Sequence, residues 1–388
     1  MVISMNTIQN LVDYIERYGD KSFAQKPFNE IDGLIFSQLA YVDFENIIGR
    51  ERKFLSDTAI KYYSIHGNEE IEGLIGISEK AVKLMHACAN TRRFGWCELC
   101  YYVNNVNVEI DKQFSAISFI LDNSTTVIAF RGTDVTVTGT KESAMLSYMF
   151  PVPAQIEALH YFQETAMITN RRIIAVGHSK GGNLAVFAGV SCSNSLKKML
   201  DGIYEYDAPG FPEWFFKRYD YRQIADKIYL YTPQGSIIGR LLDHDANPII
   251  VNSTNYGLRQ HQVSSWVIED DMFERCEKYN YSSDFVSQYI NELIAYVGED
   301  DLELFFDTLE YIVTKMGIDD FYDLRTADIH RAIGLIDSLT NLDEAQKERF
   351  KMIIKKASSD FAKEFFSSKA KIAKGYFDKF HKRREEQI

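Results

Sequence analysis

Hydrophobic and polar positions change their spacing along the chain. Over the first hundred residues, apolar side chains recur at every third or fourth position, a pattern typical of amphipathic helices. It predicts helices at residues 6–18, 30–42 and 78–89. From about residue 100 the pattern becomes strand-like. Two such runs, 114–121 and 125–131, are separated by a good turn and predict a hairpin that leads into the main sheet.

Strand and helix signals then alternate as far as residue 252. Short apolar runs predict strands at 172–176, 202–206, 227–231 and 248–252. Helical spacing between them predicts helices at 154–168 and 181–192. Short apolar strands separated by helices imply a largely parallel sheet with helices on both faces, which is an α/β fold.

The strand signal fades beyond about residue 275. The remaining chain predicts helices at 284–316, 326–339 and 343–383, with Gly298 and Gly317 as breaks. We therefore expect a sheet-containing domain over 1–275, with a helical N-terminal segment. Residues 276–388 are expected to form a helical region, either a separate bundle or a cover packed on the sheet.

Composition excludes several classes of protein. The 388 residues carry 43 Lys+Arg against 55 Asp+Glu, a net charge of −12, which argues against general nucleic-acid binding. The 46% apolar content is too high for a disordered chain. Five cysteines favour a reducing compartment over a disulfide framework. Without a signal peptide or an apolar run approaching the ~20 residues of a membrane span, the protein is expected to be soluble and cytoplasmic.

The sharpest motif is Gly177-His178-Ser179-Lys180-Gly181-Gly182, which has the spacing G-x-S-x-G. It directly follows the predicted strand at 172–176 and opens the predicted helix. This context is that of a nucleophile elbow, in which a strained turn lifts the serine Oγ above the sheet. The alternative is a tight glycine turn whose serine only caps the helix. The strand–turn–helix context favours Ser179 as a nucleophile.

Acyl transfer also needs two preorganised donors for the oxyanion. One is predicted to be the backbone N–H of Lys180, the residue after the nucleophile. The other must come from a loop after a neighbouring strand, where the segment Phe130-Arg131-Gly132-Thr133-Asp134 places Thr133. Alone, such a segment is more often an ordinary turn, and its pairing with the elbow makes it informative.

These two motifs, FRGTD and GHSKGG, resemble those of the class 3 (fungal-type) lipases and, more closely, of a lipase-like bacterial family of unknown function. The closer resemblance extends to three further segments, Pro151–Gln155, Pro233–Gly239 and Gln260-His261…Trp266, and covers about 30–270. It implies an α/β-hydrolase fold, an oxyanion role for Thr133 and a lid formed by the loop that follows.

The general base must be a histidine within reach of the serine. Four histidines follow the nucleophile: His244, His261, His330 and His381. His261 follows the last predicted strand, where the order Ser–acid–His expects the base, and it matches the lipase-like histidine. His244 lies between Asp243 and Asp245 and is interpreted as part of a solvated loop. The other two fall in predicted helices far downstream.

The acid is less directly indicated. Where class 3 lipases have their aspartate, this chain has Ser236. Asp207 ends the strand after the nucleophile helix, at the carboxyl edge of the sheet where ligands bind, and resembles the acid of pancreatic-type lipases. The alternative for Asp207 is a turn aspartate bonded to its own backbone. Asp243 and Asp245 remain as other candidates for the acid.

Four further features are each given a functional and a structural interpretation. The C-x-x-C of Cys97 and Cys100 lacks a second ligand pair and is interpreted as chance packing. Apolar residues over 141–153 form either part of a lid or acyl pocket, or a patch packed on the sheet edge. The side chain of Lys180 is expected either to favour an anionic substrate or simply to be solvated. The basic tail 369–384 is either a membrane-surface helix or, as the favoured reading, a terminal helix packed on the protein.

Together these features predict a lipase- or esterase-type serine hydrolase that uses no cofactor and acts on a small-molecule or lipid-like acyl substrate. An acyltransferase would use the same groups with a different acceptor. The third alternative is an inactive hydrolase-like binding or scaffold protein, which Ser236 at the usual acid position keeps open. The substrate and the oligomeric state are not encoded in these motifs.

Overall fold

The structure is a computed structural model. It describes residues 10–72, 76–122, 124–133, 142–143, 145–147, 149–280, 304, 308, 331, 334–339 and 342–352. The chain divides into two compact units, residues Met1–Tyr279 and Asn280–Ile388. This division falls close to residue 275, where the strand signal ends. Most of the helices expected beyond residue 280 lie outside the described residues, so their arrangement stays a prediction.

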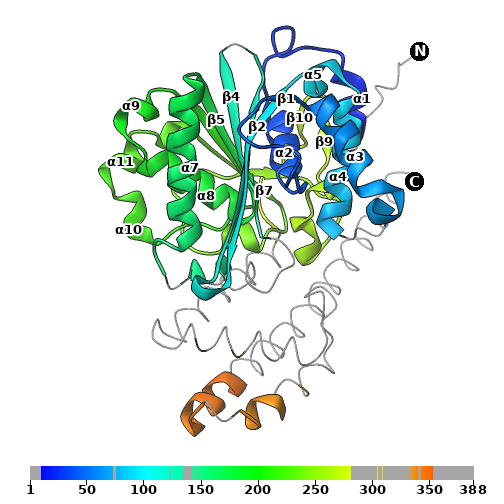
Figure 1. Ribbon diagram of the computed structural model, residues 1–388. Helices are drawn as coiled ribbons and strands as arrows, with labels where there is room; N and C mark the ends of the chain where they lie inside the picture. Colours follow the sequence, from blue (N-terminus) through cyan, green and yellow to red (C-terminus); the bar gives the residue numbers. More distant parts are fainter. Residues whose placement is uncertain are drawn as a thin grey trace, which may run out of the picture. The chain divides into compact units, whose positions relative to one another are not determined.

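An eight-stranded sheet forms the centre of the first unit, and its strands lie side by side in chain order (Figure 1). The strands are β1 (Lys53–Phe54), β2 (Glu98–Asn107), β3 (Lys112–Ile120), β4 (Thr125–Phe130), β5 (Arg172–His178), β6 (Leu200–Tyr206), β7 (Ile228–Pro233) and β8 (Ile249–Val251). The pairs from β1 to β4 are antiparallel, whereas those from β4 to β8 are parallel. The predicted α/β-hydrolase fold, with its mostly parallel sheet, is confirmed.

Helices cover both faces of this sheet (Figure 1). One face carries α7 (Pro153–Thr169), α8 (Lys180–Ser191), α9 (Asn194–Lys197), α10 (Glu213–Phe216) and α11 (Tyr219–Arg222). The other carries α1 (Leu11–Tyr18), α2 (Glu30–Leu39), α3 (Leu55–Glu72), α4 (Gly76–Ala89) and α5 (Arg92–Gly95). Because helices bury both faces, all six residues of β4 are buried, which explains the continuous apolar run there.

Short elements complete the unit. They are the 3₁₀ turns η1 (Val108–Ile110), η2 (Ala225–Lys227), η3 (Ile238–Arg240), η4 (Gly257–His261) and η5 (Val263–Ser265), and the small hairpin of β9 (Ile268–Glu269) and β10 (Met272–Phe273). Within the described parts of the chain, no helix combines the length and the hydropathy that a bilayer span requires.

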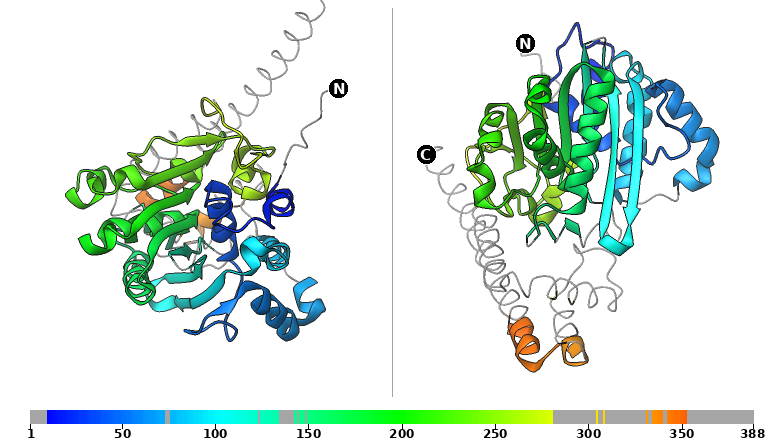
Figure 2. Two further views of the ribbon diagram at one scale, coloured as in Figure 1. Left: turned by 90° about the horizontal axis from the view of Figure 1, so that it is seen from above. Right: turned by 60° about the vertical axis from the view of Figure 1, so that its left-hand side comes forward.

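Among the longer elements, the sequence analysis missed β2 and α3. β2 pairs with β3 in a long hairpin whose far end is exposed at several positions (Figure 2). Because that end is only partly covered, its sequence carries asparagines and lacks a continuous apolar run. Exposure of the strand therefore removed the signal that identifies buried strands.

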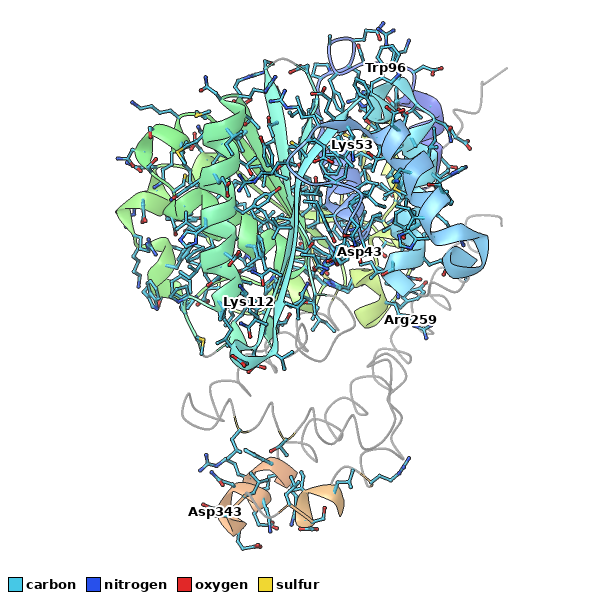
Figure 3. All side chains as sticks on the ribbon, in the orientation of Figure 1. Asp43, Lys53, Trp96, Lys112, Arg259 and Asp343 are labelled. Carbon is cyan, nitrogen blue, oxygen red and sulfur yellow. The ribbon has the colours of Figure 1, made fainter. Side chains whose placement is uncertain are left out.

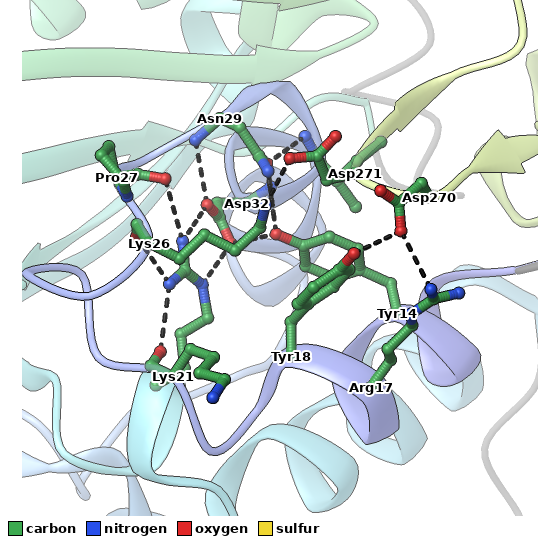
Figure 4. Close-up of polar contacts among 12 residues, drawn as sticks. Tyr14, Arg17, Tyr18, Lys21, Lys26, Pro27, Asn29, Asp32, Asp270 and Asp271 are labelled. Carbon is green, nitrogen blue, oxygen red and sulfur yellow. Dashed lines mark hydrogen bonds and ion pairs between the residues drawn. The ribbon is translucent and has the colours of Figure 1, made fainter.

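A buried ion pair fixes the N-terminal helices against the rest of the unit (Figure 4). The guanidinium of Arg93 donates through Nε to Oδ1 of Asp32 over 2.7 Å, and both side chains are fully buried. Its Nη1 donates to the carbonyls of Lys26 and Lys21, at 2.9 and 3.1 Å. Tyr14 donates to the same carboxylate over 3.2 Å. These bonds hold α2 in place, and the residues just after α2 enter the site described next.

Candidate active site

Ser179 occupies the turn between β5 and α8 in a strained conformation, with φ 56° and ψ −134°. Such a conformation costs a non-glycine residue about 1–3 kcal/mol. The flanking glycines permit the turn: a Cβ at Gly177 would lie 2.1 Å from the carbonyl carbon of Gly181, and one at Gly181 would lie 2.2 Å from the Phe130 carbonyl oxygen. The strained turn that the G-x-S-x-G spacing predicts is therefore present. The Ser179 N–H donates to the Tyr206 carbonyl over 2.9 Å and ties the turn to β6.

Asp207 and His261 form a short hydrogen-bonded pair. Asp207 directly follows β6 and has a positive φ of 48°. Nδ1 of His261, in η4, lies 2.6 Å from Oδ2 of Asp207. The aspartate side chain is 1% exposed and the histidine side chain 17% exposed. A buried carboxylate on Nδ1 fixes the ring orientation and leaves Nε2 for chemistry.

Ser236 belongs to the same network. Its Oγ donates to Oδ1 of Asp207, which also accepts the Gly239 N–H over 3.1 Å. A Cβ at Gly239 would lie 2.3 Å from that oxygen, so the approach requires glycine. The serine at the position of the class 3 aspartate thus supports a carboxylate that comes from the neighbouring strand.

The predicted oxyanion loop is packed against the elbow. A Cβ at Gly132 would lie 3.2 Å from the Cβ of Ser179 and 2.5 Å from the carbonyl oxygen of His178. Next in the chain, Thr133 follows β4 and forms a hydrogen bond with the hydroxyl of Ser143. Residues 134–141 of the predicted lid loop lie outside the described residues. The structure therefore brings Gly132, the residue before Thr133, against the nucleophile turn.

The side chain of Lys180 corrects both sequence-based expectations, because it is neither solvated nor available to an anionic substrate. It is 1% exposed, and its Nζ lies 2.8 Å from Oε2 of Glu142. Nζ also donates to the carbonyl and Oε1 of Gln113, at 2.8 and 2.7 Å. Glu142 in turn accepts the N–H groups of Gln113 and of Ala154, at 2.9 and 2.8 Å. This buried ion pair links the helix of the elbow to the segment after the oxyanion loop.

His244 differs from the solvated loop residue that the sequence predicts. Its Nε2 is buried and has no hydrogen-bond partner among the described residues, and burial lowers its pKa to about 4. It lines a small pocket together with Glu205, Phe211 and Tyr221, on the face of the sheet covered by α8. Burial also raises the pKa of Glu205 to about 8. Asp207 is hydrogen-bonded to His261 and not to His244.

Other predicted features fall partly beyond the described chain. Cys97 and Cys100 are buried, and burial raises the pKa of both thiols, which agrees with packing cysteines. In the segment 141–153, Met145 and Leu146 are buried in a small apolar cluster, whereas Met149 is 40% exposed. His330, His381 and the basic tail 369–384 lie outside the described residues.

Two groups of site residues escaped the sequence analysis. His178, the variable residue of the G-x-S-x-G motif, contacts Tyr41 and the backbone of His261. Glu142 and Gln113 enclose the ammonium group of Lys180. The partners in these contacts are separated by 38 to 137 residues, so no local spacing signals them.

The family model described as Mbeg1-like matches residues 88–310, more than half of the chain. A search of curated proteins gives no match. Among solved structures, M37 lipase is 16% identical, with a TM-score of 0.34, over 55% of this chain and 70% of that one. A Rhizomucor miehei lipase propeptide complex is 12% identical, with a TM-score of 0.34, over 57% and 67%. A lipase from Rhizopus microsporus var. chinensis is 13% identical, with a TM-score of 0.31, over 45% and 75%. The chain is similar to these lipases at low identity, and the closer bacterial family stays a prediction.

Proposed function

We propose that this chain, which belongs to the Mbeg1-like family, is a serine hydrolase that cleaves an ester or related acyl bond through an acyl-enzyme on Ser179. The 2.6 Å contact between His261 and Asp207, at the same sheet edge as the strained serine, carries the proposal. An inactive scaffold has no need of a buried carboxylate aligned on a histidine beside a strained serine turn.

In the proposed reaction, Nε2 of His261 takes the proton of Ser179 Oγ as that oxygen attacks the acyl carbonyl carbon. The charge that develops on the carbonyl oxygen is stabilised by the N–H groups of Thr133 and Lys180. His261 then gives the proton to the leaving alcohol. A water molecule, deprotonated by the same ring, attacks the acyl-enzyme, releases the acid and regenerates the serine, while Asp207 keeps the ring oriented.

The position of the residues supports this division of roles. Parallel strands end at the same edge of the sheet. The elbow follows the end of β5, the oxyanion loop follows the end of β4, and the acid follows the end of β6. Figure 3 labels one residue of the η4 turn, Arg259, and this turn also carries His261. The figure also labels Lys112, at the start of β3, and both residues lie toward the lower end of the first unit in this view. The substrate of the proposal is a small-molecule or lipid-like acyl compound, and the proposed location is the cytoplasm.

The proposal is tested with a fluorophosphonate probe and a p-nitrophenyl ester. Wild type is expected to be labelled and to release p-nitrophenol, and Ser179→Ala to do neither. Ser191→Ala is the matched control, because it removes a serine from the other end of the same helix α8. Labelling of Ser179→Ala at the wild-type rate, or the absence of labelling in wild type, would contradict the proposal.

A further inference from the structure

We propose that His178 is a positioning residue for the base, and that Tyr41 selects the tautomer in which it works. This inference rests on the proposed function. His178 is 3% exposed and lies between Gly177 and the nucleophile. Its Nε2 lies 3.0 Å from the carbonyl oxygen of His261, and its Nδ1 lies 3.2 Å from the hydroxyl of Tyr41. One imidazole therefore connects the elbow, the N-terminal segment and the backbone of the base.

The two contacts determine where the proton lies on the ring. A carbonyl oxygen only accepts, so Nε2 of His178 carries the hydrogen and donates it to His261. In the neutral ring Nδ1 is then an acceptor, and the Tyr41 hydroxyl donates to it. Burial, with the neighbouring His261, holds the pKa of His178 well below its usual value, so the ring stays neutral. The hydroxyl of Tyr41 thus favours the tautomer that binds the base.

Two further bonds to the loop that carries His261 go to the preceding residue, Gln260. Oε1 of Gln260 accepts the Gly235 N–H over 2.9 Å. The backbone carbonyl of Gln260 accepts the indole N–H of Trp266 over 2.8 Å. Neither bond reaches the nucleophile turn. The bond from His178 is the one that connects the backbone of His261 directly to the residue beside Ser179.

This connection sets the distance between base and nucleophile. Asp207 contacts only the ring of His261, whereas His178 contacts the backbone carbonyl of the same residue. The centroids of the His178 and His261 rings lie 4.5 Å apart, so a displacement of one ring also displaces the other. Because near-attack geometry tolerates little displacement, loss of this bond is expected to lower kcat and to leave substrate binding nearly unchanged.

Two substitutions separate the functions of the ring. His178→Gln places an amide N–H near the position of Nε2 and keeps the donor to His261. His178→Asn places its amide near Nδ1, where its oxygen still accepts from Tyr41, but it does not reach the His261 carbonyl. Tyr41→Phe keeps the aromatic ring and removes the hydroxyl that selects the tautomer.

The readouts are kcat and KM for p-nitrophenyl butyrate, and the low-field proton resonance of the His261–Asp207 hydrogen bond. His178→Gln is expected within about threefold of wild type in kcat, and His178→Asn about tenfold lower, with KM within about twofold. Tyr41→Phe is expected to lose roughly threefold. The low-field resonance should stay in place in His178→Gln and shift in His178→Asn, which a merely stabilising role would not cause.

The outcomes distinguish this inference from the function on which it rests. If wild type shows no labelling that depends on Ser179, both proposals fail. If wild type is labelled at Ser179 but His178→Gln and His178→Asn have equal kcat and the same resonance, only the positioning role is overturned. If His178→Asn does not fold, the pair His178→Gln and Tyr41→Phe decides: wild-type kcat in Tyr41→Phe overturns the inference.

Discussion

Glu205 makes the stability of the first unit depend on pH in a way that one substitution removes. The residue is 3% exposed on β6, beneath α8, and its carboxyl has no hydrogen bond or ion pair to any other described residue. A Cβ at Gly182 would lie 2.9 Å from the Cβ of Glu205, which shows how closely the helix covers it. Burial raises the pKa of the carboxyl from 4.5 to about 8.

The sign and size of the effect follow from proton linkage. Between pH 4.5 and about 8 the folded chain keeps the proton of Glu205 while the unfolded chain loses it. The unfolded state therefore binds fewer protons, and the free energy of unfolding falls as the pH rises through this window. At 1.36 kcal/mol per pH unit, the loss from this group is about 3 kcal/mol between pH 5 and pH 7.5. Above pH 8 and below pH 4.5 its contribution is flat.

The perturbation is Glu205→Gln, which keeps the shape and removes the titration. Urea unfolding is followed by tryptophan fluorescence, because all three tryptophans lie in the first unit, at positions 96, 214 and 266. Between pH 5 and pH 7.5, the change in the free energy of unfolding is expected to be about 3 kcal/mol less negative in the variant than in wild type. Glu109→Gln, at an exposed position of the β2–β3 hairpin, is the control and should keep the wild-type slope. An unchanged slope in Glu205→Gln would refute the reasoning.

Three further predictions concern the contacts around the site. Lys180→Met leaves Glu142 buried without its cation and should lower the free energy of unfolding by about 3–5 kcal/mol. The double variant Lys180→Met/Glu142→Gln should regain part of this stability, because it also removes the buried charge. Urea unfolding checks this, and additive losses in the double variant would contradict it. Gly239→Ala should lower kcat at least about tenfold, because its Cβ displaces Oδ1 of Asp207; wild-type kcat with the p-nitrophenyl ester would contradict that. Arg93→Leu should destabilise by about 3–5 kcal/mol in the same unfolding assay, and a loss under 1 kcal/mol would count against a structural ion pair with Asp32.

Sequence patterns predicted much of the fold because buried strands and helices carry apolar residues at characteristic local spacings. The parallel strands β4 to β7 are largely buried and therefore carry short apolar runs. These strands and the edge strand β8 were each expected within a few residues of their observed bounds. The elbow is also local, since its glycines, serine and following helix occupy adjacent positions. β2 was missed because most of its residues are only partly buried and its apolar pattern is broken by asparagines.

The contact partners of the site residues could not be predicted from the sequence. Lys180 looked like a solvated lysine in the first turn of a helix, and its burial depends on Glu142 and Gln113, which reach it from other segments. His244 looked exposed because it lies between two aspartates, yet its ring faces the pocket beside Glu205. In each case the environment of the side chain is set by residues distant in the chain.

The sequence by itself determined the alternation of strands and helices, the strained serine turn and the short list of histidines and acids that could accompany it. These follow from local conformational preferences and from the period of apolar positions. Only the tertiary structure decided that Asp207, with Ser236 as its donor, meets His261, and that His178, contacted by Tyr41, reaches the backbone carbonyl of His261. The physical reason is that hydrogen bonds form between atoms about 3 Å apart in space, whatever their separation along the chain.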